Sequence, residues 1–458
     1  MISQAGNRGP SESGTRERTG AGLWHKPLRN AGKLGLGRGF QAVCSLACLG
    51  VSTRCLGADG FGTLVLIHSL CLAIAQLARF QGWRYTIRYG TLALGKSSPV
   101  ELHRVLNFGF ALDLIGVLVG VGVYAVGFSA LARLVGLPEA SRGLALLYGV
   151  FAVTLTNFAG SAMGVLRLLD RFTALAWQST LEPLVRLGGS LLVLWVGGGL
   201  RAFLIVWLLA LLADKAGLVY VTVAALRSRG LAAGFRFDPS VVWRADSGMW
   251  RFAWGTQWDA TLKLGQRHLP MLMVGSLAGV AAAGLFKAAQ QFSDGLVNLN
   301  SKLLVPAVFP EIARLTDAGQ IAERKAMMLK SSAFIATLAL GLILVLAVFG
   351  RPLIAGIAGP AFTGAYATML WLAFAGGVGA ASFTLEPFLL AHGDTRSVVT
   401  ANALALVVHV TLLSLLLPRI GLVGSGIAAV AQVVAQTLLL SGFILRKHTG
   451  RTRSARRD

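Results

Sequence analysis

Charged residues are scarce in this sequence. Asp, Glu, Lys and Arg make up 13% of its 458 residues, whereas soluble proteins carry roughly a quarter. Hydrophobic residues make up 55%, and the mean hydropathy is +0.68. Because apolar surface in that excess must face something other than water, the composition excludes an ordinary soluble protein and predicts an integral membrane protein.

Acidic residues are the scarcer of the two charged classes. The 19 acids stand against 42 bases, which gives a formal net charge of +23. On a soluble chain such a charge would suggest nucleic-acid binding. Here the bases lie mostly between apolar runs, and no segment is both polar and long enough to fold a continuous basic face. We therefore predict no nucleic-acid partner and attribute the positive charge to orientation in a membrane.

Signals of catalysis and of cofactor binding are also lacking. The four cysteines, Cys44, Cys48, Cys55 and Cys71, lack the polar neighbours that a metal site needs, so we interpret them as small buried hydrophobes. The histidines show no H-E-x-x-H spacing, and the glycine-rich segment 32–39 does not form a phosphate-binding loop. The sequence predicts a protein that is not an enzyme and that needs no metal or cofactor.

Long apolar runs dominate what is present. A spanning helix needs about 20 mostly apolar residues, and twelve runs meet this requirement. They cover residues 38–56, 61–80, 105–128, 142–164, 174–198, 200–226, 252–276, 281–305, 331–350, 362–391, 397–417 and 422–445. Polar residues interrupt the first two, and we expect a kink in the glycine-containing run 362–391. The short connections leave no room for a separate extramembrane domain.

The distribution of basic residues predicts the orientation. With the N-terminus in the cytosol, the cytosolic segments carry 30 of the Arg and Lys residues and the outer loops carry 6. This bias fits the positive-inside rule and an even number of spans, with both termini cytosolic. The remaining bases fall within predicted spans: Arg186, Lys215, Lys263, Arg267, Lys287 and Lys302.

The chain has the pattern of a duplication. Gly57 and Gly62 stand five apart between runs 1 and 2, and Gly279 and Gly284 have the same spacing between runs 7 and 8. Two parallel halves around a central cleft are a recurrent transporter plan. We predict a disordered basic tail over 1–37, a six-helix bundle over 38–226, a cytosolic connector over 227–250, a second six-helix bundle over 251–446 and a basic cytosolic tail over 447–458.

Ionisable residues inside the spans are candidates for function, because they are costly unless they face the bundle interior or a wet cavity. Asp259, Lys263 and Arg267 stand four apart and share one helix face. The other intramembrane charges of interest are Asp113, Glu182, Arg186, Asp214, Lys215, Lys287, Asp294 and Lys302. We interpret Glu182 and Arg186 as a structural pair and assign substrate binding to Lys263, Arg267 and Lys287. Excess positive charge selects an anion, and the arginine fork suits a diphosphate.

Aromatic and amide side chains accompany these charges. Trp258 and Gln266 lie on the same predicted helix as Arg267, and Gln290 lies on the next. Such groups suit sugar recognition, so we add all three to the candidate substrate-binding residues. Trp250 and Trp254 fit an interfacial aromatic belt better.

Four stretches resemble the Wzx-like oligosaccharide flippases, the polysaccharide exporters of the MATE-related superfamily. They are Leu56–Gly62 (LGADGFG), Ala283–Gln291 (AGLFKAAQQ), Pro306–Arg314 (PAVFPEIAR) and Gly421–Ala428 (GLVGSGIA). The resemblance spans nearly the whole chain. It implies an all-α membrane fold of two six-helix bundles in a V shape. It also implies a bacterial inner-membrane location and undecaprenyl-diphosphate-linked oligosaccharides as substrates, with membrane lipids and a polymerase or other polysaccharide-assembly proteins as partners.

Two alternatives remain open. A cation-coupled multidrug or metabolite exporter would need an acidic cleft, with Asp113, Asp259 and Asp294 essential. Drug-exporting relatives tend to carry an acid in the first helix, and run 1 has none. A membrane glycosyltransferase or polymerase would carry an acidic catalytic loop or a sizeable outer loop, and the sequence shows neither.

Overall fold

The computed structural model describes the backbone of residues 21–96, 98–244, 247–294, 321–391 and 394–454. Every regular element within these ranges is a helix. Nine helical stretches of the described chain are long and apolar enough to cross a membrane, although the first, Gly39–Gly95, covers two of the predicted spans. The predicted all-α membrane fold is confirmed.

The helices fall into two halves of the chain. The N-terminal half contains α1 (Ala21–Ala78), α2 (Gly82–Gly95), α3 (Pro99–Leu134), α4 (Glu139–Asn157), α5 (Gly160–Leu168), α6 (Phe172–Gln178), α7 (Leu181–Val196) and α8 (Leu200–Ser228). The connector holds the short 3-10 helix η1 (Pro239–Val242). The C-terminal half contains α9 (Ser247–Ala278), the helical segment 280–294, α11 (Ile321–Ile357), η2 (Pro360–Ala365), α12 (Tyr366–Ala381), α13 (Leu385–Ala391), α14 (Thr395–Ile420) and α15 (Val423–Ser454).

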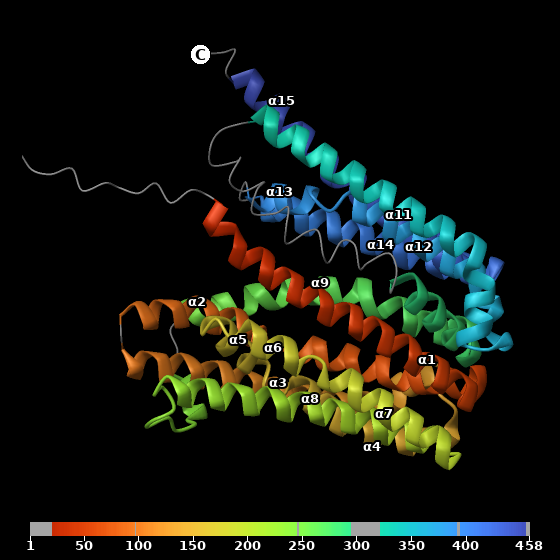
Figure 1. Cartoon of the computed structure of the whole chain (residues 1–458), viewed down its shortest axis with the longest axis horizontal. Coiled ribbons are helices and arrows are strands. Elements are labelled where there is room, and N and C mark those ends of the chain that lie inside the picture. Colours follow the sequence, from red (N-terminus) through yellow and green to blue (C-terminus); the bar gives the residue numbers. More distant parts are fainter. Residues whose placement is uncertain (1–20, 97, 245–246, 295–320, 392–393, 455–458) are drawn as a thin grey trace, which may run out of the picture.

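The first two predicted spans share α1, which is kinked at Gly57 with φ 64° and ψ −172°. The chain reverses its direction at this kink (Figure 1). A positive φ is costly for residues with a side chain, so glycine suits this turn. Helix α2 was not predicted, because Trp83, Arg84 and Arg88 interrupt its apolar residues and the run falls short of a spanning segment.

Three predicted spans are broken rather than continuous. The run 142–164 divides into α4 and α5, and Ala159 at the break has φ 60°. The run 174–198 divides into α6 and α7, and the run 362–391 contains η2, α12 and α13. The glycines of the run 362–391 predicted its kink. Hydropathy continues across the other two breaks, so an apolar run alone does not reveal them.

The two glycine turns of the apparent duplication lie against each other at one end of the molecule (Figure 1). A methyl group added to Gly62 would collide with the carbonyl oxygen of Val280, and one added to Gly284 would lie 2.7 Å from the carbonyl oxygen of Ala58. Only glycine allows the two backbones to approach this closely. The halves are therefore in direct contact at this end.

Helix α11 and η2 complete the same contact. The rings of Phe61 and Phe362 meet edge to face, with centroids 6.0 Å apart. The guanidinium of Arg54 donates a hydrogen bond to the carbonyl of Gly356. A single cluster of buried hydrophobic residues runs through this region and draws on both halves. This closed end lies next to the candidate site.

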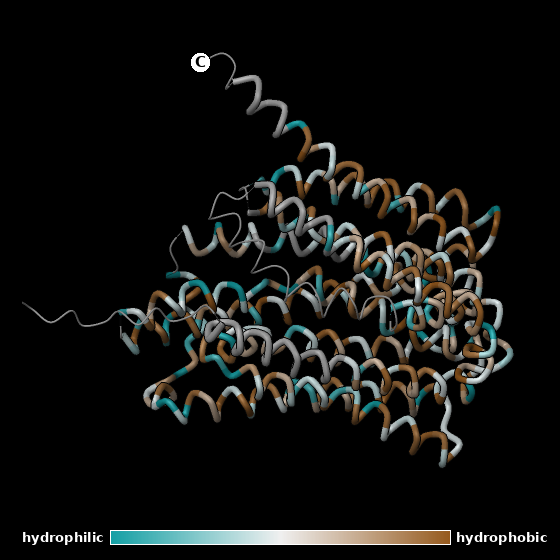
Figure 2. The backbone as a smooth tube through the Cα atoms, turned by 45° about the horizontal axis from the view of Figure 1, so that its top comes forward, coloured by the Kyte–Doolittle hydropathy of each residue, from teal (hydrophilic) through white to brown (hydrophobic). Residues whose placement is uncertain are grey.

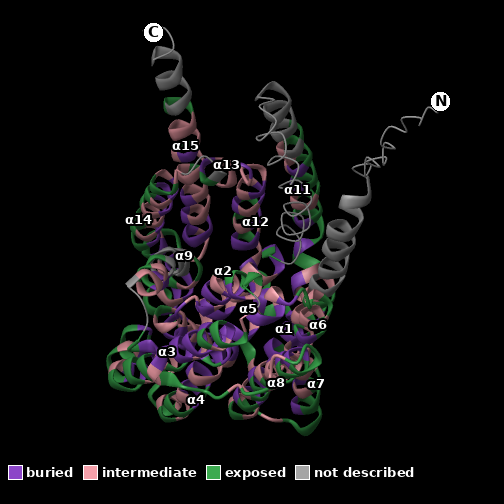
Figure 3. Cartoon of the chain, turned by 90° about the vertical axis from the view of Figure 1, so that its left-hand side faces the viewer, coloured by how far each residue is buried: buried purple, intermediate pink, exposed green. Residues whose placement is uncertain are grey.

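The outer faces of the helices are apolar. Val126 is 88% exposed and Trp195 is 84% exposed, as expected for side chains that face lipid. Exposed residues lie along the outside of the helices and buried residues lie between them (Figure 3). Hydrophilic residues gather toward the end that carries the connections between α2 and α3 and between α8 and α9 (Figure 2).

Candidate functional site

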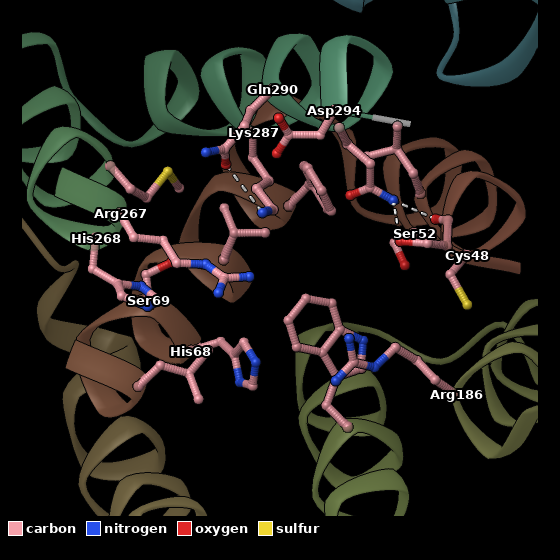
Figure 4. A pocket seen from close by; sticks show the side chains of 18 of the residues that line it. Cys48, Ser52, His68, Ser69, Arg186, Arg267, His268, Lys287, Gln290 and Asp294 are labelled. Atoms are coloured by element: carbon pink, nitrogen blue, oxygen red, sulfur yellow. Dashed lines mark hydrogen bonds between the residues drawn. The ribbon is translucent and has the colours of Figure 1, made fainter. Parts of the chain in front are cut away.

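A cavity of about 280 Å³ lies between the two halves, next to the closed end. Helices α1, α7 and α8 form the wall on the N-terminal side, and α9 with the segment 280–294 forms the opposite wall (Figure 4). Its lining includes Ser45, Cys48, Ser52, His68, Ser69, Glu182, Arg186, Trp207, Arg267, His268, Lys287, Gln290, Gln291 and Asp294. Polar and charged side chains thus line a space enclosed by apolar helices.

The C-terminal wall presents its charges to the cavity. The Arg267 side chain extends from α9 into the cavity (Figure 4), and none of the described carboxylates forms an ion pair with it. On the segment 280–294, the Nζ of Lys287 donates to the Oε1 of Gln290 at 3.2 Å. Asp294 lies about two helical turns beyond Lys287 on the same segment and also lines the cavity.

The N-terminal wall holds its charge more tightly. A guanidinium nitrogen of Arg186 lies 2.6 Å from the Oε1 of Glu182, one helical turn earlier in α7. The same guanidinium lies over the ring of Trp207, 4.6 Å from its centroid. The ring of His68 packs edge-on against Trp207 at 4.8 Å, and its Nδ1 lies 2.7 Å from the hydroxyl of Tyr148. These contacts fix the position of Arg186.

The charge balance of the described lining is positive. Three bases, Arg186, Arg267 and Lys287, face two acids, Glu182 and Asp294. Since Glu182 is engaged by Arg186, two bases on the opposite wall remain for one acid. A cavity with surplus fixed positive charge and low-dielectric walls attracts anions, and a group with several oxygen acceptors could bridge both walls.

Six of the predicted intramembrane or substrate-binding residues come together here: Glu182, Arg186, Arg267, Lys287, Gln290 and Asp294. Gln266 does not line this cavity, because its amide donates to the carbonyl of Asn402 at 3.1 Å within the C-terminal half. The backbone of Trp258, Asp259 and Lys263 lies in α9, but their side chains lie outside the described part of the structure, as does Lys302.

Asp113 lies apart from the cavity. It is 5% exposed, and its Oδ2 accepts a hydrogen bond from the backbone N–H of Ser161 at 2.7 Å. A carboxylate at this position satisfies an N–H group that the first turn of α5 leaves free. The contact gives Asp113 a structural role at the break between α4 and α5.

The site also contains residues that the sequence analysis overlooked. Ser45, Ser52, His68 and Ser69 line the cavity from the two arms of α1, and His268 does so from α9. Polar residues had marked the first two runs as poor spans. In the structure, these interruptions occur where α1 faces a polar cavity rather than lipid, and this was the signal that could have identified them.

The chain is similar to known proteins over most of its length. Residues 104–367 match the family model described as polysaccharide biosynthesis protein. The inner membrane protein YghQ of Escherichia coli (strain K12) is 28% identical over 349 residues, which cover 75% of this chain and 96% of YghQ.

Solved structures share the fold. The lipid II flippase MurJ in an inward closed conformation aligns with a TM-score of 0.72 and 10% identity, over 90% of this chain and 87% of MurJ. A multidrug resistance MATE family transporter of the MOP superfamily, in an inward-facing conformation, aligns with a TM-score of 0.69 and 12% identity, over 91% of this chain and 96% of that one. At these identities the likeness shows the fold alone.

Proposed function

The chain belongs to the polysaccharide biosynthesis protein family, and from that premise we propose that it is a flippase for an undecaprenyl-diphosphate-linked oligosaccharide. The family relates the chain to polysaccharide biosynthesis, and its fold is that of MOP-superfamily transporters rather than of an enzyme. A polysaccharide made from lipid-linked units needs a step that carries each unit across the membrane. A polytopic transporter of this family suits that step.

The observation that carries the proposal is the positive cavity between the halves. Arg186 from one wall, and Arg267 with Lys287 from the other, surround the same space. A diphosphate is a compact anion with several acceptor oxygens, and the arginine fork binds two of them at once. The amide of Gln290 and the hydroxyls of Ser45 and Ser52 are suited to sugar hydroxyls.

The proposed mechanism is alternating access. The glycine contacts close one end, and the halves rock about the connector 227–250 to open that end while the other closes. With both termini in the cytosol, the closed end is the outer one, so the described conformation receives substrate from the cytosolic side. The substrate anion offsets the repulsion between Arg267 and Lys287, which favours bringing the walls together around it.

The location follows from the same proposal. We place the chain in the bacterial inner membrane, as the name of its relative YghQ states for that protein. The partners would be the lipid-linked substrate, membrane lipids, and a polymerase or other polysaccharide-assembly proteins.

The test uses purified protein in liposomes. A lipid-diphosphate oligosaccharide is supplied in one leaflet, and its appearance in the other is measured with a glycan-cleaving enzyme added outside. Wild-type protein should accelerate the transfer, and the Arg267→Ala variant should do so at least about tenfold more slowly. Wild-type liposomes that fail to move this lipid, but extrude a cationic dye in exchange for Na⁺ or H⁺, would replace the flippase with the exporter.

A further inference from the structure

A second cavity of about 420 Å³ lies within the C-terminal half, beside the charged one. Its walls are α12 with the start of the bend that follows it, the segment 280–294, and α15. The residues from α12 and this bend are apolar. Four of them are small, Ala375, Gly376, Gly379 and Ala380, and two are large, Leu372 and Phe383. Gln290, Ser293 and Asp294 of the segment 280–294 form its one polar edge, so the cavity is apolar everywhere except along that segment.

The two cavities share part of one helical segment as a wall. Gln290 and Asp294 line both of them, and Lys287 lies one turn before Gln290 on the charged side. Figure 4 shows Lys287, Gln290 and Asp294 together at one edge of the charged cavity. A molecule with a charged head and an apolar chain could therefore place its head on Lys287 and its chain against the α12 side of the second cavity.

We propose that this second cavity holds the isoprenoid units next to the diphosphate; the inference rests on the proposed function and names how the lipid part of that substrate is recognised. The isoprenoid units next to the diphosphate must lie within the protein, because they are bonded directly to the group that it binds. Leaving them among charged side chains would strip water from those groups without replacing its hydrogen bonds. The apolar sides of the second cavity, formed by α12, the bend after it and Val433 of α15, accept them without that cost, and the rest of the chain continues into the bilayer.

Small residues make the space. A methyl group added to Gly379 would lie 3.5 Å from the Cγ1 of Val433 across the cavity, which is an ordinary contact. Alanine therefore fits at position 379, whereas a tryptophan would fill the cavity. Phe374, on the same helix, is 44% exposed and does not line the cavity. The Phe374→Trp variant is thus a control that adds an indole on α12 outside the cavity.

The experiment measures the binding of two ligands to purified protein in nanodiscs. Both carry the same glycan diphosphate, esterified in one case to a three-isoprene chain and in the other to methanol. We expect Gly379→Trp to weaken binding of the isoprenoid ligand by tenfold or more and to leave the methyl ligand within twofold. Gly379→Ala and Phe374→Trp should change neither by more than twofold, and Arg267→Ala should weaken both.

The outcomes separate the two proposals. If wild-type protein binds neither ligand, the proposed function fails and this inference fails with it. If it binds both, and Gly379→Trp leaves the affinity for the isoprenoid ligand unchanged, only the inference about the chain is wrong. Retained binding of the methyl ligand also shows that the variant is folded.

A second measurement covers a Gly379→Trp variant that does not fold. An isoprenoid ligand with a diazirine on its first unit is photolysed with wild-type protein, and the adducts are located by mass spectrometry. Adducts within residues 366–391 are expected. Adducts confined to α1, α7 or α8 would overturn the inference.

Discussion

The two walls of the charged cavity treat their arginines differently. On the N-terminal wall, Arg186 is held by Glu182 at 2.6 Å and by the ring of Trp207. On the C-terminal wall, Arg267 lines the cavity without an ion pair to any described carboxylate. A cation that the protein already neutralises contributes mainly to architecture, whereas a cation without a protein partner keeps its capacity for a ligand.

This difference has an energetic reason. An unpaired charge inside a membrane protein costs several kcal/mol unless water or a ligand reaches it. Arg267 is exposed to the cavity, so water reduces this cost in the unliganded protein, and an anion reduces it further. The Arg186 side chain is less exposed, at 21%, and its ion pair with Glu182 offsets the free energy needed to bury its charge. The comparison predicts that substitutions at the two positions will affect different properties.

Arg267→Ala should have the largest effect on transport. A hydrogen bond to a charged group contributes about 1.5–3 kcal/mol, so loss of the bidentate contact should slow transport about tenfold to a hundredfold. Folding and insertion should be unchanged, since no described carboxylate depends on Arg267. The matched control is Arg201→Ala, which removes an exposed arginine at the start of α8. An Arg267→Ala protein that does not insert would assign the residue a structural role.

A thiol probe checks the same wall directly. In a background without Cys44, Cys48, Cys55 and Cys71, a water-soluble reagent should label the Arg267→Cys variant. Absence of labelling in both cleft orientations would show that this face of α9 does not line a wet pathway.

Gly62→Ala tests what sets the distance between the walls. The added methyl group would collide with the carbonyl oxygen of Val280, so the closed end should open and transport should fall severalfold. An Ala58→Cys variant in the cysteine-free background should become more reactive toward an impermeant thiol reagent. Gly122→Ala is the control, because nothing lies within 4 Å of its added methyl group. Equal reactivity of Ala58→Cys with and without Gly62→Ala would show that this contact is not a gate.

Arg267→Lys should have a smaller effect than Arg267→Ala. It keeps the positive charge and loses the planar fork that binds two oxygens, so transport should fall about threefold to tenfold, corresponding to roughly 1 kcal/mol. The measurement is the initial transfer rate in liposomes at saturating substrate. A Lys variant as inactive as the Ala variant would show that geometry, rather than charge, governs the site.

Sequence alone predicted the fold well because lipid leaves a strong signal. Each apolar run of about 20 residues had to become helical, since no other local structure satisfies its backbone groups in a bilayer. The glycines of the run 362–391 pointed to the kink that follows Ala381. The break near Ala159 could not be predicted, because it depends on contacts between helices, such as the hydrogen bond from the Ser161 N–H to Asp113.

The site was predicted only in part. The charges at Arg267, Lys287 and Asp294 stood out because ions are rare in spans. Polar residues such as Ser52 and His68 did not, since side chains of these types also form hydrogen bonds between packed helices. Which polar residues share a cavity depends on which helices pack against each other. A single sequence does not show that packing.

Substitutions of the Glu182–Arg186 pair should have the smallest effect on transport. We expect Arg186 to serve mainly to hold the N-terminal wall. Arg186→Ala leaves Glu182 without its ion-pair partner, and Glu182→Ala leaves Arg186 without its partner. Each single variant should lower the unfolding temperature in detergent, while the double variant should be more stable than the sum of the two losses predicts. Pairs of this kind inside membrane proteins have coupling energies of about 0.6–2 kcal/mol. Both side chains are partly exposed to the cavity, so we expect the coupling energy of this pair toward the lower end of that range. A coupling energy of zero, together with a transport loss in Arg186→Ala as large as in Arg267→Ala, would show that the two walls act alike and that Arg186 also binds the substrate.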